Sequence, residues 1–208
     1  MALFDHAHQR VVLKIVYCGP GFGGKTENLA YLHRHAWRHS APGNLIALAT
    51  DTGRTLFFDL LPLALGRING YEIALQLYSV PGQTFYEANR SRVMQGADGI
   101  VFVADSQASM FAANVESLYD LNRMLQSWGM GATEFPWVIQ YNKRDLAEAM
   151  PIADLQEGLN PWGVPCVEAT ASAGTGVVET LRAITRVVVG GLQTRAALQQ
   201  AIGAALAV

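Results

Sequence analysis

The chain has 208 residues, of which 50% are hydrophobic and 15% charged, enough apolar material for one folded domain. This composition excludes a disordered or fibrous protein. Fifteen Lys and Arg residues against seventeen Asp and Glu residues give a net charge of −2. That near-neutral balance argues against a nucleic-acid-binding surface and against a polybasic membrane anchor.

The chain carries no recognisable targeting or anchoring signal. The first ten residues lack the apolar stretch of a signal peptide, and no segment approaches the roughly 18 apolar residues that a membrane span needs. Neither common lipid-anchor motif is present. Cys18 and Cys166 each lie in an apolar run and are expected to be reduced core thiols. We therefore expect a cytoplasmic protein that has no direct membrane anchor and is a monomer when free.

Strand-like and helix-like runs alternate along the chain. Strands are predicted over residues 11–18, 45–49, 73–80, 100–104, 137–141 and 165–167. Helices are predicted over 24–38, 110–128, 146–159 and 177–192, the third of them interrupted by Pro151. This alternation predicts an α/β fold with a mostly parallel central sheet and helices on both faces. We expect a single domain over 1–192. The Ala-rich end, 193–208, is predicted to be a helical tail that either packs on the domain or binds a partner.

The segment after the first predicted strand has the spacing G-x-x-x-x-G-K-T, the pattern of a P-loop NTPase. Glycines let the backbone wrap a pyrophosphate with its N–H groups, at the start of a helix whose dipole favours anions. Lys25 can reach the β- and γ-oxygens, and the Thr26 hydroxyl can bind Mg²⁺. The candidate phosphate-binding residues in this segment are Gly19, Pro20, Gly21, Phe22, Gly23, Gly24, Lys25, Thr26 and Glu27.

A second motif, N-K-x-D, follows the fifth predicted strand. The Asp145 carboxylate can accept hydrogen bonds from the ring N–H and the exocyclic amine of guanine, a pair of donors that adenine does not present there. Asn142 and Lys143 would brace this loop. After the last strand, the segment 168–172 could give a backbone N–H to the guanine carbonyl oxygen. The candidate guanine-binding residues are Asn142, Lys143, Asp145, Thr170, Ala171 and Ser172.

Three other features have two interpretations each. Asp105 follows the apolar run IVFVA and is predicted to cap the next helix, although its position also places it near the nucleotide edge. His35 and His39 would share a helical face, as metal ligands or as a solvated helix end. The apolar run 56–58 is either core or a partner surface exposed in one nucleotide state.

Several segments together resemble the Ras-like small GTPases, and more closely their bacterial MglA-type branch, the gliding and polarity GTPases. The resemblance extends from about residue 10 to residue 190 and is carried by KIVYCGPGFGGKTENL, RTLFFDLLPLALG, LYSVPGQTFYEANR, GIVFVADSQ and VIQYNKRDL. It implies a Ras-like G domain with six or seven strands, GTP or GDP as ligand and Mg²⁺ as cofactor. It also implies very slow intrinsic hydrolysis, a roadblock-fold MglB-type activator and downstream effectors.

The resemblance also implies catalytic residues. Gln83 stands where a Ras-like GTPase holds the glutamine that orients the attacking water, and Gly82 would offer its amide to the γ-phosphate. Thr55 matches the switch threonine that meets Mg²⁺ and the γ-phosphate. Arg54 resembles the arginine that MglA-type proteins supply in cis to the transition state.

One position departs from the Ras-like pattern. Ser79 stands in place of the aspartate that holds Mg²⁺ through water, a loss that the MglA-type branch shares, usually with threonine there. Asp59 is the nearest carboxylate that could replace it, which makes Thr26, Thr55 and Asp59 the candidate metal residues. The departure leaves a non-hydrolysing guanine-nucleotide scaffold open as an alternative to a GTPase. An ATPase or nucleotide kinase would need a second substrate pocket and no guanine-selective aspartate.

Overall fold

The computed structural model of the protein describes residues 3–5, 9–35, 46–49, 55–68, 71–80 and 92–206. Of residues 3–5, 46–49, 55–59, 65–68 and 193–206 it describes the backbone alone. The helices are α1 (Lys25–His35), the short 3-10 helix η3 (Ala108–Met110), α3 (Phe111–Ser127), α4 (Ile152–Leu159) and α5 (Val177–Leu206). The strands are β1 (Leu3–Asp5), β2 (Arg10–Cys18), β3 (Ile46–Ala49), β4 (Thr55–Ile68), β5 (Tyr71–Ser79), β6 (Gly99–Asp105), β7 (Trp137–Asn142) and β8 (Cys166–Glu168).

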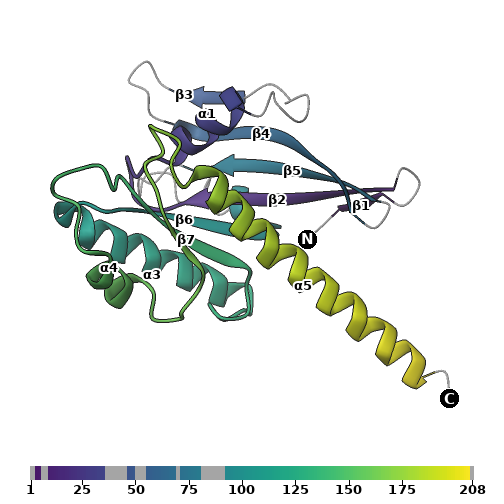
Figure 1. Ribbon diagram of the computed structural model, residues 1–208. Helices are drawn as coiled ribbons and strands as arrows, with labels where there is room; N and C mark the ends of the chain where they lie inside the picture. The colour runs from purple at the N-terminus through teal and green to yellow at the C-terminus, as the bar shows by residue number, and fades with distance from the viewer. Residues whose placement is uncertain are drawn as a thin grey trace.

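The described strands form one sheet in the order β3-β4-β5-β2-β6-β7-β8, with β1 paired to β2 (Figure 1). The five strands from β5 to β8 in this order are parallel, whereas β4 runs antiparallel to β3 and β5, and β1 antiparallel to β2. Every residue of β6 and β7 is buried, as expected for central parallel strands with helices on both faces. The predicted mostly parallel α/β fold is therefore confirmed.

Helices cover both faces of the sheet and enclose two apolar clusters. On one face α1 and α5 cover a cluster that includes Leu29, Leu75, Val138 and Ile184. On the other face α3 and α4 cover a cluster that includes Phe102 and Leu121. The two clusters use alternate residues of the same strands, because successive side chains of a strand point to opposite faces. The phosphate loop (residues 19–26) follows β2, the base loop (residues 142–145) follows β7, and the segment 170–172 follows β8. All three leave the sheet at the same end, the carboxyl end of its parallel strands.

The structure differs from the predicted elements at three places. Residues 55–68 form the long strand β4, for which no strand was predicted. Pro62 lies within its apolar run, and its pairing with β5 shifts register between Ala64 and Gly66. With β1 added, the described part of the chain has eight strands in its sheet, more than the resemblance implied. The helix predicted from residue 146 begins only at Ile152, because Pro151 disfavours helical backbone at the residue before it.

The C-terminal region is continuous with the last helix of the domain. Helix α5 runs without a break from Val177 to Leu206 and extends past the edge of the sheet in Figure 1. The predicted boundary between a domain over 1–192 and a tail over 193–208 thus falls inside one helix, and the division stays a prediction. Within the described residues, no helix combines the length and apolar character needed to cross a bilayer.

The two cysteines are both free, but their environments differ. Cys18 is buried at the end of β2, as predicted for a core thiol. Cys166 is exposed, so the prediction of a core position was wrong for this residue. It lies on β8 at the edge of the sheet, where the Gln156 side chain of α4 donates a hydrogen bond to its Sγ atom.

Candidate functional site

The G-x-x-x-x-G-K-T segment forms the turn between β2 and α1, as the motif requires. Two of its glycines are needed there for steric reasons. Gly19 has a φ of +130°, and a Cβ atom on it would collide with the carbonyl oxygen of Val103 on β6. Gly24 has a φ of +97°, and a Cβ atom on it would collide with Nδ2 of Asn142. The loop therefore packs directly on the ends of two neighbouring strands.

Lys25 is almost fully buried, with 6% of its surface exposed. Its ammonium group donates hydrogen bonds to the carbonyl oxygens of Gly19 (3.1 Å) and Pro20 (2.6 Å). The charge is therefore held inside the curve of the loop. A lysine held there is placed to meet phosphate oxygens that enter the loop.

The Thr26 hydroxyl lies 3.5 Å from the hydroxyl of Ser79 at the end of β5. Ser79 is fully buried. On the neighbouring strand, the Cα atom of Asp59 is the register partner of Ser79, and Thr55 begins the same strand opposite Ala49. Ser79, which replaces the usual aspartate, and the three candidate metal residues therefore come from adjacent segments. The structure describes only the backbone of Thr55 and Asp59.

The three catalytic candidates inferred from the resemblance, Arg54, Gly82 and Gln83, fall outside the residues that the structure describes. The last described residue before Gly82 and Gln83 is Val80. Its N–H donates to the carbonyl oxygen of Tyr17, near the end of β2 and just before the phosphate loop. His39 also lies outside the described residues. His35 stacks on the Tyr31 ring with a centroid distance of 4.0 Å.

Asn142 connects the two motifs. Its side-chain amide donates to the carbonyl oxygen of Gly23 (2.8 Å) and accepts from the N–H of Ala171 (2.9 Å). One buried side chain thereby ties the phosphate loop to the N-K-x-D loop and to the loop after β8. This agrees with the bracing role predicted for Asn142.

Lys143 has a φ of +65°, a conformation that L residues rarely adopt. Its ammonium group forms an ion pair with Oδ2 of Asp105 at 2.6 Å.

The prediction of Asp105 as a helix cap was wrong: the N-cap positions are Gln107 for η3 and Met110 for α3. The Asp105 carboxylate accepts from Gln107 and pairs with Lys143. The ion pair with Lys143 agrees instead with the second interpretation, a place near the nucleotide edge directly after a buried strand.

A cavity of about 280 Å³ lies where these loops meet. It is lined by Gly24, Glu27, Asn142, Lys143, Asp145, Leu146, Ala171 and Ser172. The predicted phosphate-binding and guanine-binding segments, more than 100 residues apart in sequence, therefore share one cavity. The Glu27 carboxylate on its wall is paired with Arg34 at 3.1 Å.

Two tyrosines flank the motifs with buried, unpaired hydroxyl groups. Tyr17 precedes the phosphate loop and Tyr141 precedes Asn142. Both are fully buried, and neither hydroxyl has a hydrogen-bond partner among the residues that the structure describes. Burial raises the pKa of both phenols above the usual range, and the charge of Cys166 adds to the effect at Tyr141. Both groups are therefore neutral at physiological pH.

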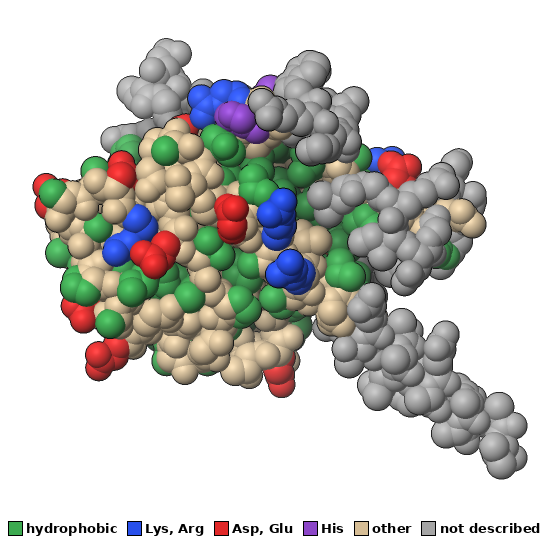
Figure 2. Space-filling view, viewed as in Figure 1, with side chains coloured by type: hydrophobic (Ala, Val, Ile, Leu, Met, Phe, Trp, Pro, Cys, Tyr) green, Lys and Arg blue, Asp and Glu red, His purple; other side chains and the backbone are tan. Residues whose placement is uncertain are grey.

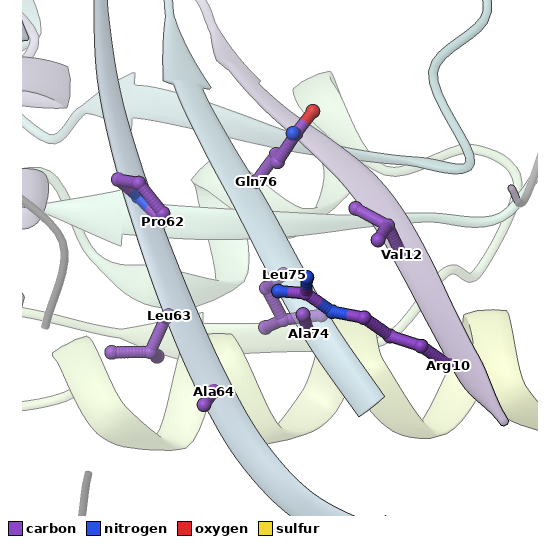
Figure 3. A pocket seen from close by; sticks show the side chains of 8 residues that line it. All are labelled: Arg10, Val12, Pro62, Leu63, Ala64, Ala74, Leu75 and Gln76. Carbon is purple, nitrogen blue, oxygen red and sulfur yellow. The ribbon is translucent and has the colours of Figure 1, made fainter. Parts of the chain in front are cut away.

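A second cavity, of about 310 Å³, lies away from these loops (Figure 3). It is lined by residues of β2, β4 and β5, and Figure 3 shows the Arg10 side chain extending from β2 across β5 toward Ala74. It holds none of the motif residues, so its size does not make it the candidate site. Figure 2 shows acidic and basic side chains intermixed over the described part of the face that bears α5.

Comparisons with known proteins agree with the site geometry. Residues 53–189 match the Ras family. The chain is 44% identical over 193 residues to the mutual gliding-motility protein MglA of Myxococcus xanthus (strain DK1622), an alignment that covers 93% of this chain and 98% of that protein. An ATPase or nucleotide kinase is set aside by this relationship. The chain belongs to the Ras family, as a guanine-nucleotide-binding GTPase of the MglA type.

Proposed function

We propose that this protein is a nucleotide-dependent switch that binds GTP or GDP with Mg²⁺ and hydrolyses GTP to GDP and phosphate. The observation that carries the proposal is the shared cavity, whose wall includes Gly24 and Glu27 of the phosphate loop and Asp145 of the N-K-x-D loop. A nucleotide lying along this cavity would meet a phosphate-binding turn at one end and a base-reading carboxylate at the other.

The fixed side of the site binds the nucleotide. The segment Gly19–Glu27 holds the phosphates through its N–H groups and the Lys25 ammonium. The Asp145 carboxylate accepts from the guanine edge, and Lys143 lies along the base. Support comes from the lining of the cavity by Lys143, Asp145, Ala171 and Ser172. We assign the remaining base contact to the segment 170–172.

The metal fits the donors that this end of the sheet presents. Mg²⁺ prefers hard oxygen ligands and is held by few protein groups together with substrate phosphates. Thr26 would hold it directly, beside the Ser79 hydroxyl. We assign Thr55 as a further ligand and Asp59 as the carboxylate that compensates for Ser79, supported by the register of Asp59 opposite Ser79. When bound, the metal supplies charge neutralisation at the β- and γ-oxygens.

The catalytic side is proposed from the family relationship. Gln83 orients the attacking water, the Gly82 N–H donates to the γ-phosphate, and Arg54 neutralises charge in the transition state. Such an arginine accelerates phosphoryl transfer by about 10³- to 10⁵-fold when it is correctly placed. We expect slow hydrolysis by the protein alone and stimulation by a roadblock-domain, MglB-like activator. By analogy with MglA of Myxococcus xanthus, the switch acts in cell polarity or gliding motility.

A nucleotide panel tests the binding proposal. The wild-type protein should bind GDP and GTP at micromolar concentration or below with Mg²⁺ present, and should not bind ADP or ATP. Asp145→Asn should shift the preference from guanine to xanthine nucleotides, because the amide now donates where the carboxylate accepted. Asp154→Asn, an exposed acid on α4, is the matched control and should leave the preference unchanged. Failure of the wild-type protein to bind guanine nucleotides would end the proposal.

A second candidate function is favoured by one observation. Ser79 is neutral and buried beside Thr26, where a carboxylate would support the metal. The protein could then be a guanine-nucleotide scaffold that does not hydrolyse GTP. Single-turnover GTP hydrolysis, with and without a roadblock-domain partner, separates the two. Loss of the stimulated rate in Arg54→Ala would support the cis arginine, and an unchanged stimulated rate would contradict it.

A further inference from the structure

A chain of buried side-chain hydrogen bonds crosses the interior beneath the candidate site. It consists of Asn28 on α1, Gln140 on β7 and Thr180 on α5. All three residues have 0% of their surface exposed. None of them belongs to the phosphate-loop or base-loop motifs.

The two amides pair with each other in both directions. Asn28 Nδ2 donates to Gln140 Oε1 at 2.8 Å, and Gln140 Nε2 donates to Asn28 Oδ1 at 2.9 Å. The second hydrogen of Gln140 Nε2 goes to Thr180 Oγ1 at 2.9 Å. Every N–H of the Asn28 and Gln140 amides is therefore used, because Asn28 Nδ2 also donates to the carbonyl oxygen of Gly24.

The two ends of this chain reach the segments that carry the two halves of the site. At one end Asn28 holds the Gly24 carbonyl of the phosphate loop, at 2.9 Å. At the other end the Thr180 hydroxyl donates to the carbonyl oxygen of Gly176 at 2.6 Å, where the loop after β8 enters α5. The path has a fixed direction of donation, so its members cannot exchange partners without leaving a buried polar atom unpaired.

The chain lies directly below the bridge made by Asn142. Gln140 and Asn142 are two residues apart on β7 and therefore point to the same face of the sheet. Asn142 joins the Gly23 carbonyl to the Ala171 N–H. One layer deeper, Gln140 joins Asn28 of α1 to Thr180 of α5, the two helices that follow those segments. The segments that carry the two halves of the site are thus connected by two stacked amide bridges, one between their loops and one between the helices that follow them.

We propose that Gln140, with Asn28 and Thr180, is a positioning residue that sets how long a guanine nucleotide stays bound. This rests on the proposed function, since it requires a nucleotide that contacts both halves of the site. GDP meets the phosphate loop and the base loop at once, and it is retained best when the two cannot move apart. Weakening the lower bridge lets each half release its part of the ligand separately, which raises the dissociation rate.

The decisive variant replaces the whole polar chain by apolar side chains. Asn28→Leu/Gln140→Leu/Thr180→Val leaves no orphaned partner, because the Gly24 and Gly176 carbonyls still accept the backbone N–H groups of residues 28 and 180. Replacing all members of a buried polar pair by apolar groups is close to neutral for stability. A structural role alone therefore predicts that the triple variant retains both its melting temperature and its nucleotide.

The measurement is the release of a fluorescent GDP analogue in the presence of Mg²⁺, chased with excess GDP, alongside thermal unfolding. We expect the triple variant to unfold within a few degrees of wild type but to release nucleotide about tenfold faster or more. A dissociation rate within twofold of wild type would overturn the proposal. A wild-type protein that binds no guanine nucleotide contradicts the proposed function instead, so the two failures are distinguishable.

A conservative pair decides the question if the triple variant does not fold. Thr180→Val removes the hydroxyl at nearly constant shape and should accelerate release about fivefold or more. Thr180→Ser restores the hydroxyl and should return the rate to within twofold of wild type. Thr185→Val is the matched control, because its hydroxyl donates only to the Leu181 carbonyl of its own helix. Equal rates in Thr180→Val and Thr185→Val would overturn the proposal.

Discussion

The ammonium group of Lys143 lies 2.6 Å from Oδ2 of Asp105, which fixes the loop after β7 to the end of β6. The Asp105 side chain is only 1% exposed. Its backbone is held in turn by the Asn114 side chain, which accepts from the Asp105 N–H and donates to its carbonyl oxygen. The Asn114 side chain therefore holds Asp105 in place, and the ion pair with Asp105 stabilises the left-handed backbone conformation of Lys143.

Asp105→Asn should weaken guanine nucleotide binding because it removes the charge that holds Lys143. Breaking a buried ion pair costs about 3–5 kcal/mol, and Lys143 is partly exposed, so we expect a smaller loss, about tenfold in GDP affinity. Isothermal titration measures it. Glu168→Gln is the control, since the Arg144–Glu168 pair is at the surface and should contribute little. Equal effects of both variants would contradict this prediction.

Ser79→Asp should make the stability of the protein depend on magnesium. The new carboxylate would be buried beside Thr26, where burial disfavours its charged form unless a cation is bound. We expect a melting temperature several degrees lower in EDTA with GDP, since 1 kcal/mol corresponds to about 2–4 °C in a chain of this size. Addition of Mg²⁺ should recover most of it. Ser79→Asn, neutral and of the same size, should show no such recovery.

Gly174→Ala should destabilise the loop between β8 and α5. Gly174 has a φ of +85°, and a Cβ atom on it would collide with the Tyr31 ring of α1. We expect a loss of about 2–4 kcal/mol from the combined backbone strain and overpacking, measured by urea unfolding. Gly163→Ala separates the two causes, because Gly163 has a φ of +63° but no atom within 4 Å of the added carbon. The Gly174 variant should lose clearly more stability than the Gly163 variant.

Tyr17→Phe and Tyr141→Phe should each stabilise the protein. Each removes a buried hydroxyl that has no hydrogen-bond partner in the described part of the chain, and we expect a gain of about 1 kcal/mol in the free energy of unfolding. Tyr119→Phe is the control, because that ring is 63% exposed and its hydroxyl can reach water. A loss of stability in Tyr17→Phe would show that the hydroxyl has a partner after all.

The stability of the wild-type protein should fall in alkali, and Tyr17→Phe should reduce the slope. Burial raises the pKa of the Tyr17 phenol in the folded state. Above the ordinary tyrosine pKa of about 10, the unfolded chain has lost this proton while the folded chain still holds it. The free energy of unfolding therefore decreases as pH rises through that value. Urea unfolding at pH 8 and above pH 10 compares the two proteins.

Much of the fold and of the site could be predicted because the signals are local. The buried run 100–104 and the Gly-rich turn after Cys18 are each defined by a few neighbouring residues, and the structure places β6 and the phosphate loop there. Strand β4 could not be predicted from a comparable pattern, because it is long, irregular in register and contains Pro62. Its pairing with β3 and β5 stabilises it despite the weak local signal.

The sequence by itself determined the two motifs, since wrapping a phosphate and reading a guanine edge each depend on residue types within eight neighbouring positions or fewer. The tertiary structure alone decided which distant residues meet them: Asp105 beside Lys143, Asp59 in register with Ser79, and Gln140 between Asn28 and Thr180. These partners are set by strand order and by the packing of α1 and α5 on one face of the sheet. Strand order and helix packing cannot be inferred from the spacing of neighbouring residues, because these segments come together only when the sheet forms.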